Sequence, residues 1–406
     1  MSDMKRAIIR IGDVADIGRG SSPRPITDKK YFENGEIPWI KIADATVSGK
    51  YIYKTKQYVN DLGASYSRKM KPGTLILSAS GSLGIPHFLG VEGCIHDGWI
   101  YMDNIHDIDK QYLYYLLLTM RPYFDNLSYG AAIQNINTSI LSKTKIEVPS
   151  IQSQEKIGLM LSAYDNLIEN NNKRIKLLEQ MAESLYKEWF VRFHFPGYEN
   201  EYFIEDVPSS WCYVQLGDIA SFDRGISYSS DEINCDDGIN LINLKNIQSY
   251  GGFRRDGTKQ YNGKYKDSQI VAVGDLILGV TDMTQDRRTV GSVALIPQIS
   301  GTSAISADLV KVNLKVPNVF FYCMCRYGFY SKYFSQFANG ANVLHLKPKV
   351  LLNKKILLPT AELIEAFVEK VQPMIDIVDD LNCQNDLLTK QRDMLLPRLM
   401  SGKLEV

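Results

Sequence analysis

The chain contains an internal duplication, and this feature limits its fold more than any other. The segment IGDVADIGRG at 11–20 returns as LGDIASFDRG at 216–225. Three further pairs follow in the same order: PGTLILS with VGDLILG, YFDNLSYGAAIQNI with YFSQFANGANVLHL, and KIEVP with KILLP. Repeats that keep their order indicate two copies of one folding unit. The second copy also carries an insertion near TDMTQDRRTVGS, at 281–292.

Each copy begins with a domain of mixed secondary structure, at 1–149 and at 205–359. Short apolar runs such as TLILSA, CIHDGWIYM and DLILGV are bounded by Gly, Asn, Asp and Ser, a pattern typical of strands and turns. More helical stretches precede Tyr129 and Asn339. We therefore expect two mixed α/β domains. The repeated Gly-Asp pairs, Gly12-Asp13 and Gly217-Asp218, are expected to be structural, as an N-cap that begins a short helix.

Each copy ends in a long helix, at 150–195 and at 360–406. Ser150 and Thr360 are suitable N-caps, and apolar residues then recur at alternating spacings of four and three, as in a coiled coil. If a pseudo-two-fold axis relates the copies, the two helices must run antiparallel.

The antiparallel register predicts which residues of the two helices face each other. It sets Asn171 opposite Asn385 and Arg392 against Tyr164, whose hydroxyl and ring can accept a cation. A polar pair inside an apolar seam opposes any slip of register, because a slip leaves each amide buried without a partner. Pro373 lies within the second helix, where we expect a kink or a break.

Composition excludes several classes of protein. Of 406 residues, 45% are apolar and 23% charged, which is typical of a folded globular chain. No signal peptide or long uncharged apolar run is visible, so we expect a cytoplasmic protein with no membrane contact. The six cysteines are scattered, which favours free thiols over a metal site.

The charge is balanced overall, with 46 basic and 46 acidic residues, but it is not evenly distributed. The two mixed domains carry a small basic excess, and the two helical segments an acidic one. About forty helical residues would span roughly 60 Å, so the helices could separate two mildly basic readers of a split DNA target.

The chain resembles a known family, the specificity subunits of type I restriction–modification systems. The resemblance covers essentially the whole chain. It depends on the duplicated GDVADIGRG and GDIASFDRG segments, IPWIKIAD, PGTLILSASGSLG, VPSIQSQEKI, SLYKEWFVRFHFPG and LLPRLMSGKL. It implies two target recognition domains, each reading half of a bipartite, gapped DNA sequence, with two helices that set the spacing.

The resemblance also implies partners. These are two methyltransferase subunits, which bring S-adenosylmethionine for adenine-N6 methylation, and restriction subunits that use ATP and Mg²⁺ and join through the methyltransferase subunits. The chain itself would bind no cofactor or metal and would not be an enzyme. In agreement, it has no Asn/Asp-Pro-Pro-aromatic motif, and GFRRDGTK at 252–259 does not fit a phosphate-binding loop.

Candidate DNA contacts are side chains able to read bases or bind phosphates on loops of the two domains. In the first domain they are Arg19, Ser21, Ser22, Arg24, Ser78, Ser80, Ser82, Tyr129, Gln134 and Asn135. In the second they are Arg224, Tyr228, Ser229, Thr281, Gln285, Arg287, Arg288, Asn339, Asn342 and His345. Any one of these could instead cap a turn or face water.

Two other functions remain open from the sequence. The chain could be a DNA methyltransferase without a recognisable catalytic motif, or a duplicated coiled-coil scaffold that binds only proteins. Methyl transfer by the isolated chain would favour the first, and DNA affinity that does not depend on salt would favour the second.

Overall fold

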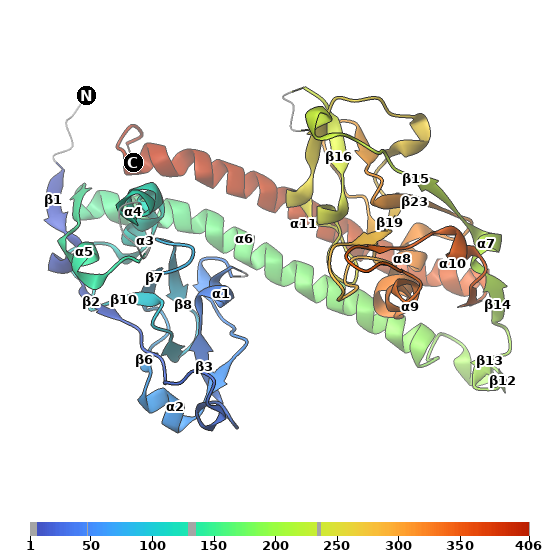
Figure 1. Ribbon diagram of the computed structural model, residues 1–406, viewed down its shortest axis with the longest axis horizontal. Helices are drawn as coiled ribbons and strands as arrows, with labels where there is room; N and C mark the ends of the chain where they lie inside the picture. Colours follow the sequence, from blue (N-terminus) through green and yellow to red (C-terminus); the bar gives the residue numbers. More distant parts are fainter. Residues whose placement is uncertain (1–5, 47, 129–134, 234–236, 406) are drawn as a thin grey trace. The chain divides into compact units, whose positions relative to one another are not determined.

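The computed structural model describes residues 6–46, 48–128, 135–233 and 237–405. The chain divides into two compact units: unit 1 comprises 1–171 and 384–406, and unit 2 comprises 172–383. Each unit contains one of the two repeated domains together with one part of each long helix (Figure 1).

Unit 1 contains two main sheets and a two-stranded one. The main sheets have the strand orders β2-β10-β7-β8-β4 and β5-β3-β9-β6, and β1 pairs with β11. The strands are β1 (Ala7–Arg10), β2 (Asp16–Arg19), β3 (Ile37–Ile40), β4 (Tyr51–Ile52), β5 (Tyr58–Val59), β6 (Arg68–Met70), β7 (Leu75–Ser78), β8 (Pro86–Leu89), β9 (Gly93–Ile95), β10 (Trp99–Asp103) and β11 (Lys145–Val148). The short helices are α1 (Ile42–Ala45), α2 (Asp61–Ser65), α3 (Lys110–Thr119), α4 (Arg121–Ser128) and α5 (Thr138–Lys143).

Unit 2 repeats this topology. Its main sheets have the orders β15-β23-β19-β21 and β17-β16-β22-β18, and β14 pairs with β25. The strands are β14 (Cys212–Gln215), β15 (Ala220–Arg224), β16 (Ile239–Ile242), β17 (Lys259–Tyr261), β18 (Ile270–Val271), β19 (Leu276–Gly279), β21 (Val293–Leu295), β22 (Ser303–Ile305), β23 (Leu309–Leu314) and β25 (Lys355–Leu358). The short helices are α7 (Leu216–Ile219), α8 (Asn318–Tyr327), α9 (Tyr330–Ser335) and α10 (Lys349–Leu352).

Unit 2 also has strands without a counterpart in the described part of unit 1. The predicted insertion forms β20 (Thr281–Asp282), which pairs with β24 (Leu344–His345). A separate hairpin, β12 (Phe203–Ile204) with β13 (Val207–Pro208), follows the first long helix.

The long helices are α6 (Ile151–Tyr186), which continues as a π-helical turn over Lys187–Val191, and α11 (Ala361–Met400). Both predicted caps are present: Ser153 N donates to Ser150 Oγ at 3.3 Å and Leu363 N to Thr360 Oγ1 at 3.3 Å. α11 is helical across Pro373, so the alternative of a break there is wrong. Proline has no backbone N–H, so the carbonyl of Glu369 lacks its usual hydrogen bond from residue 373. Glu369 is exposed, and its carbonyl can bind water instead.

Within each unit the two helices pack antiparallel. In unit 1, Ile157 and Leu161 of α6 share a core with Leu399 near the end of α11. In unit 2, the rings of Trp189 and Phe367 lie 5.9 Å apart, so the end of the first helical segment meets the start of α11. The mixed α/β fold with two long, packed helices is thereby confirmed.

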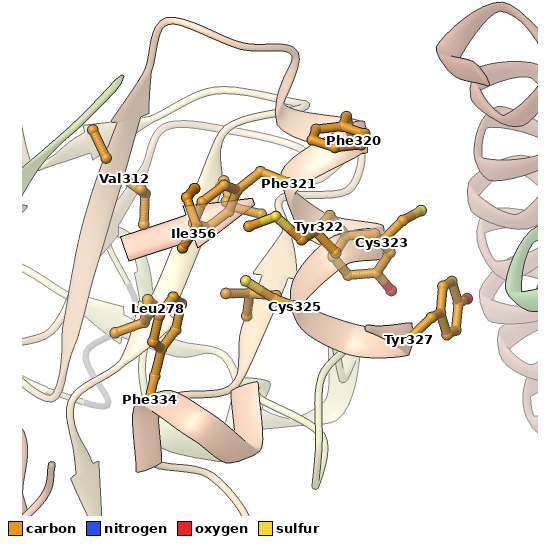
Figure 2. Close-up of a cluster of buried hydrophobic side chains, with 14 of the residues drawn as sticks. Leu278, Val312, Phe320, Phe321, Tyr322, Cys323, Cys325, Tyr327, Phe334 and Ile356 are labelled. Carbon is orange, nitrogen blue, oxygen red and sulfur yellow. The ribbon is translucent and has the colours of Figure 1, made fainter. Parts of the chain in front are cut away.

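The core of unit 2 joins its sheets to α8 (Figure 2). Phe321 and Cys325 lie beside Leu278 and Ile356 of the strands, whereas Cys323 points to another side of the helix. Both thiols are at most 1% exposed, and burial raises the pKa of each. These cysteines therefore act as small apolar side chains in the core.

The repeated Gly-Asp pairs begin short helices in both units, as expected, but the aspartates sit at the third helical position and not at the N-cap. Asp13 accepts from Arg10 N at 3.3 Å, and Asp218 from Gln215 N at 3.1 Å. A Cβ at Gly12 would lie 2.0 Å from Ser142 Oγ, so the glycine permits close packing against α5. These residues build the scaffold of each domain.

Candidate nucleic-acid interface

In unit 1, the loop after β2 folds around Asp97. Arg19 Nε donates to Asp97 O at 2.7 Å, Ser22 Oγ accepts from Asp97 N at 3.3 Å, and Arg24 forms an ion pair with the Asp97 carboxylate. Ser21 contributes its backbone, which donates to Ile95 O at 3.2 Å. Residues distant in sequence thus hold the Arg19–Arg24 loop in one conformation. Asp97 is not among the residues predicted from the sequence, because nothing in its local sequence marks it as the partner of this loop.

Further cationic and aromatic groups surround this loop. His96 Nδ1 lies 2.9 Å from Asp97 Oδ1, and the His96 ring lies 5.4 Å from that of Trp39. Lys41 Nζ lies 5.0 Å from the centroid of the same tryptophan ring. Burial lowers the pKa of His96, and Lys41, Arg24 and Arg19 lower it further against the opposing effect of Asp97. His96 and Lys41 therefore extend the predicted site.

The predicted serine turn, residues 78–82, lies beside the turn that carries Asp97. Ser78 is 2% exposed, and its hydroxyl donates to Ser82 O and accepts from Ile85 N at 2.9 Å, so it holds the turn. Ser80 is half-buried and Ser82 exposed. A Cβ built on Gly98 would lie 2.8 Å from Ser80 Oγ, which places Ser80 beside the turn that carries Asp97.

The third predicted segment of unit 1 adjoins the serine turn. Ile136 N donates to Ala79 O at 3.1 Å, and the neighbouring Asn135 is exposed. Tyr129 and Gln134 lie outside the described residues. Among the described residues, the Arg19–Arg24 loop, the serine turn and the chain at Asn135 and Ile136 therefore lie next to one another.

In unit 2, the loop after β15 has a different set of contacts. Ser229 begins a 3-10 turn, and its N–H and hydroxyl donate to Glu232 Oε2 at 2.8 and 3.2 Å. Tyr228 is half-buried, with Lys259 Nζ 5.5 Å from its ring centroid. Arg224 is exposed, and its guanidinium has no hydrogen bond or ion pair among the residues that the structure describes. In the described part of this loop, at 225–233, no contact reproduces the Arg24–Asp97 pair.

The inserted loop of unit 2 meets the segment around 339–345. β20 pairs Thr281 with His345, and Gln285 Nε2 donates to Ala341 O at 2.9 Å. Asn339 and His345 exchange backbone hydrogen bonds of 3.0 and 2.9 Å. Thr281 is only 4% exposed, whereas Gln285, Asn339, Asn342 and His345 are all exposed. Two segments chosen separately from the sequence thus form one polar surface.

The two inserted arginines differ in their surroundings. Arg287 has φ 53° and donates from Nη1 to Ser335 O at 3.1 Å, so it is tied to the fold. Arg288 has an ion pair with Asp286 at 2.6 Å, and its side chain is 55% exposed. Arg288 is therefore the more accessible cation.

Asp282 is the second residue that the sequence analysis missed. Its carboxylate accepts from Thr284 N at 2.9 Å, from Thr289 N at 2.8 Å and from Val290 N at 3.3 Å. Burial by itself would raise the pKa of Asp282, but the hydrogen bonds from Thr289 and Thr284 outweigh burial and lower the pKa to about 2. Asp282 remains ionised at neutral pH and closes the loop that carries Gln285, Arg287 and Arg288.

Of the two polar pairs expected on the helices' seam, Asn171 with Asn385 is present, whereas Arg392 has a different partner. Asn171 Nδ2 donates to Asn385 Oδ1 at 3.0 Å, and Asn171 is 5% exposed. Arg392 pairs with Asp165, however, and not with the adjacent Tyr164. A carboxylate one residue away gives the guanidinium a charged acceptor, which is stronger than a phenol ring.

Asp165 also belongs to a buried polar network that attaches α3 and α6 in unit 1. Tyr115 donates to Asp165, while Lys50 Nζ lies 3.1 Å from Tyr115 Oη and 2.9 Å from Ser162 Oγ. Burial lowers the pKa of Lys50 to about 8, although Asp165 opposes this effect. The network fixes the first domain on its helices.

Within the described ranges, no group of three or more His, Cys, Asp and Glu side chains could hold a metal ion. No helix of the described chain has both the length and the apolar character needed to cross a membrane.

Comparison with known proteins shows which family the chain resembles. Residues 2–180 match the Type I restriction modification DNA specificity domain. The type I restriction enzyme MjaIX specificity subunit of Methanocaldococcus jannaschii is 26% identical, over 98% of this chain and 93% of that protein. The type I restriction enzyme HindI specificity subunit of Haemophilus influenzae is 21% identical, over the full length of both chains.

A solved structure shows the same fold. The crystal structure of a type I restriction–modification system S subunit from M. genitalium superimposes with a TM-score of 0.64 at 15% identity, covering 98% of this chain and 97% of that one. With the duplicated topology, the packed long helices and the full-length matches together, the chain is similar over its whole length to the DNA specificity subunits of type I restriction–modification systems.

Proposed function

We propose that the two units each read one half of a bipartite, gapped DNA target. The observation that carries this proposal is the repetition of one sheet topology with different loops. The strand order β2-β10-β7-β8 corresponds to β15-β23-β19-β21, yet the loop at 281–292 and the Arg24–Asp97 pair have no match among the described residues of the other unit. Domains that share a scaffold and differ at their polar loops suit two different half-sites.

The DNA-contacting surface of each unit is proposed to be its cluster of converging loops. Exposed amide and guanidinium groups suit bases, because Arg recognises guanine and Asn or Gln recognises adenine. Arg24, Ser82 and Asn135 fill this role in unit 1, and Gln285, Arg288 and Asn342 in unit 2. The buried Ser78 and Thr281 shape the loops from beneath.

The helices are proposed to set the gap between the half-sites and to dock two methyltransferase subunits. Docking is supported by large apolar side chains that are exposed at matching positions. Leu167 of unit 1 corresponds to Ile377 of unit 2, and they are 51% and 40% exposed. Leu387 of unit 1 corresponds to Leu177 of unit 2, and they are 60% and 59% exposed. Two equivalent apolar surfaces suit two copies of one partner.

In the assembled complex, S-adenosylmethionine would be bound by the methyltransferase subunits, and ATP and Mg²⁺ by restriction subunits attached through them. This chain would supply sequence recognition, with adenine N6 as the methylated atom. The duplicated topology supports the proposal of one reader for each half-site.

The direct test is to map N6-methyladenine in DNA exposed to the complex of this chain with its methyltransferase. The expected motif has two short specified parts separated by unspecified bases. A continuous motif would contradict two separate readers. Affinity should also fall steeply as salt rises, because Lys and Arg displace counterions from the phosphates, and no dependence on salt would instead support a scaffold that binds only proteins.

A further inference from the structure

We propose that Asp97 is a positioning residue that presents Arg24 to a guanine in the half-site read by unit 1. This proposal rests on the proposed function and adds the base and the pair of residues that recognises it. The Arg24 guanidinium uses Nη2 on the Asp97 carboxylate, and its side chain is 66% exposed. Guanidinium has five donors, so the remaining edge can still meet guanine O6 and N7.

The main chain of Arg24 is anchored as firmly as its side chain. Tyr31, which is 5% exposed, donates from its hydroxyl to Arg24 O at 3.1 Å. Asp97 is itself held by Arg19 Nε at its carbonyl and by Ser22 Oγ at its N–H. Both partners of the pair are thus fixed by the fold before DNA arrives, which lowers the entropy lost on binding.

Stability alone does not explain the Arg24–Asp97 pair. An exposed ion pair contributes little to folding, because water screens the charges and two side chains lose freedom. Asp97 is also unfavourable for non-specific DNA binding, since its charge repels the phosphates that Arg19, Lys41 and Arg24 would attract. A carboxylate within a basic site is useful where it orients a donor toward one base.

Unit 2 lacks this device. The position that matches Asp97, next to the turn before β23, is Ala307, whose N–H donates to Ile226 O at 2.7 Å. Arg224, the counterpart of Arg19, is exposed, with no guanidinium partner among the described residues. At the position of Asp97, unit 2 therefore has no carboxylate that could orient an arginine, so the proposed guanine-reading pair is a feature of unit 1.

The test uses the complex of this chain with its methyltransferase and a library of DNA duplexes in which each base pair of both half-sites is changed singly. Arg24→Ala should reduce discrimination at one G·C pair of a single half-site by about 10- to 100-fold. Asp97→Ala and Asp97→Asn should reduce discrimination at the same pair, without weakening binding to unrelated DNA. The double variant Arg24→Ala/Asp97→Ala should be no worse than Arg24→Ala.

Two further variants separate this role from charge and folding. Arg24→Lys keeps the charge but not the planar fork, so it should lose discrimination as Arg24→Ala does. The matched control is Asp256→Ala, which removes an exposed Arg–Asp pair of 2.8 Å in unit 2 and should leave every base preference unchanged. Thermal melting of each complex checks that the fold is intact.

Three results would overturn the proposal. Arg24→Ala could weaken all duplexes equally and reduce the salt dependence, which would make Arg24 a phosphate contact. Asp97→Ala could leave discrimination intact, which would remove its positioning role. The pair could also act at a base other than guanine. A wild-type complex without any gapped preference would instead contradict the proposed function, so the two failures are distinguishable.

Discussion

At the scale of single residues, Asp97 and Asp282 organise polar loops in their respective units. Asp97 joins the loop of Arg19 and Arg24 to the turn before β10, and Asp282 closes the inserted loop of unit 2. The partners of Asp97 in that loop lie 73 to 78 positions away in the sequence, whereas those of the Asp282 carboxylate lie within eight positions. A loop held in this way keeps its exposed side chains in one arrangement, which reduces the cost of ordering them on DNA.

Asp282→Ala should destabilise unit 2 by about 2–3 kcal/mol, because Thr289 N and Val290 N lose their acceptor in a buried place. Urea unfolding followed by tryptophan fluorescence measures this change. Asp223→Ala is a suitable control, since it removes an exposed bond of 2.8 Å to Asn313 and should cost far less. Equal losses would show that the loop does not depend on Asp282.

The stability that Asp282 contributes should depend on pH. Its pKa is about 2 in the fold and 3.8 ordinarily, so the folded state favours the ionised form. This contribution, roughly 2 kcal/mol, is complete above about pH 5 and is lost as pH falls toward 2. The difference in unfolding free energy between wild type and Asp282→Asn should therefore shrink over that interval. A constant difference from pH 6 to pH 2.5 would rule out this linkage.

At the scale of elements, the long helices combine an apolar seam with a few polar contacts. The seam supplies most of the contact, as with Ile157, Leu161 and Leu399 in unit 1. The polar contacts, such as Asn171 with Asn385, add little attraction but can be satisfied in one register only. The register of the two helices therefore depends on these few polar contacts.

Asn171→Leu should reduce the unfolding free energy of the chain by about 1–2 kcal/mol, because Asn385 loses its bond and faces a leucine. The double variant Asn171→Leu/Asn385→Leu should recover much of this loss, since both polar groups are gone. Chemical denaturation and assembly with the methyltransferase are the two measurements. Additive losses in the double variant would show that the amides do not act as a pair.

Pro373 gives a second prediction for the helices. Pro373→Ala restores an N–H that can bond to Glu369 O and removes the clash of the ring with the preceding turn. The substitution should raise the unfolding free energy by about 1–3 kcal/mol. Pro397→Ala, in the last turns of the same helix, provides a comparison with a smaller expected gain. A loss of stability for Pro373→Ala would mean that α11 needs a bend at this place.

At the scale of the whole molecule, one chain carries two similar but distinct units. If each reads its own half-site, as proposed, substitutions in the two units should have separable effects. The single variants Asn342→Ala and Gln285→Ala should each reduce base preference in one half-site by about tenfold. Arg24→Ala should affect the other half-site. Methylation of duplexes with one altered half-site provides the measurement. If variants of unit 1 and variants of unit 2 altered the preference at the same base pairs, the two units would not act separately.

The sequence by itself determined the duplication, the mixed α/β character of each copy, the long helices, and the caps at Ser150 and Thr360. These features depend on local patterns of apolar spacing and turn residues, which a single sequence displays. The helices of Ile151–Tyr186 and Ala361–Met400 followed from such a pattern. Apposition of Asn171 with Asn385 also needed only a symmetry argument, because the helices are regular.

The tertiary structure alone decided which side chains meet across the sheets and loops. Arg24 and Asp97 are separated by 73 positions, so their pairing depends on how β2 and β10 align. Arg392 pairs with Asp165 and not with Tyr164. Helical register places both residues near Arg392, but side-chain direction and charge determine which of them it contacts. Ser78 is polar yet 2% exposed, since its turn folds inward. Contacts of this kind are determined by tertiary folding, which brings distant segments together. The local sequence does not indicate which segments will meet.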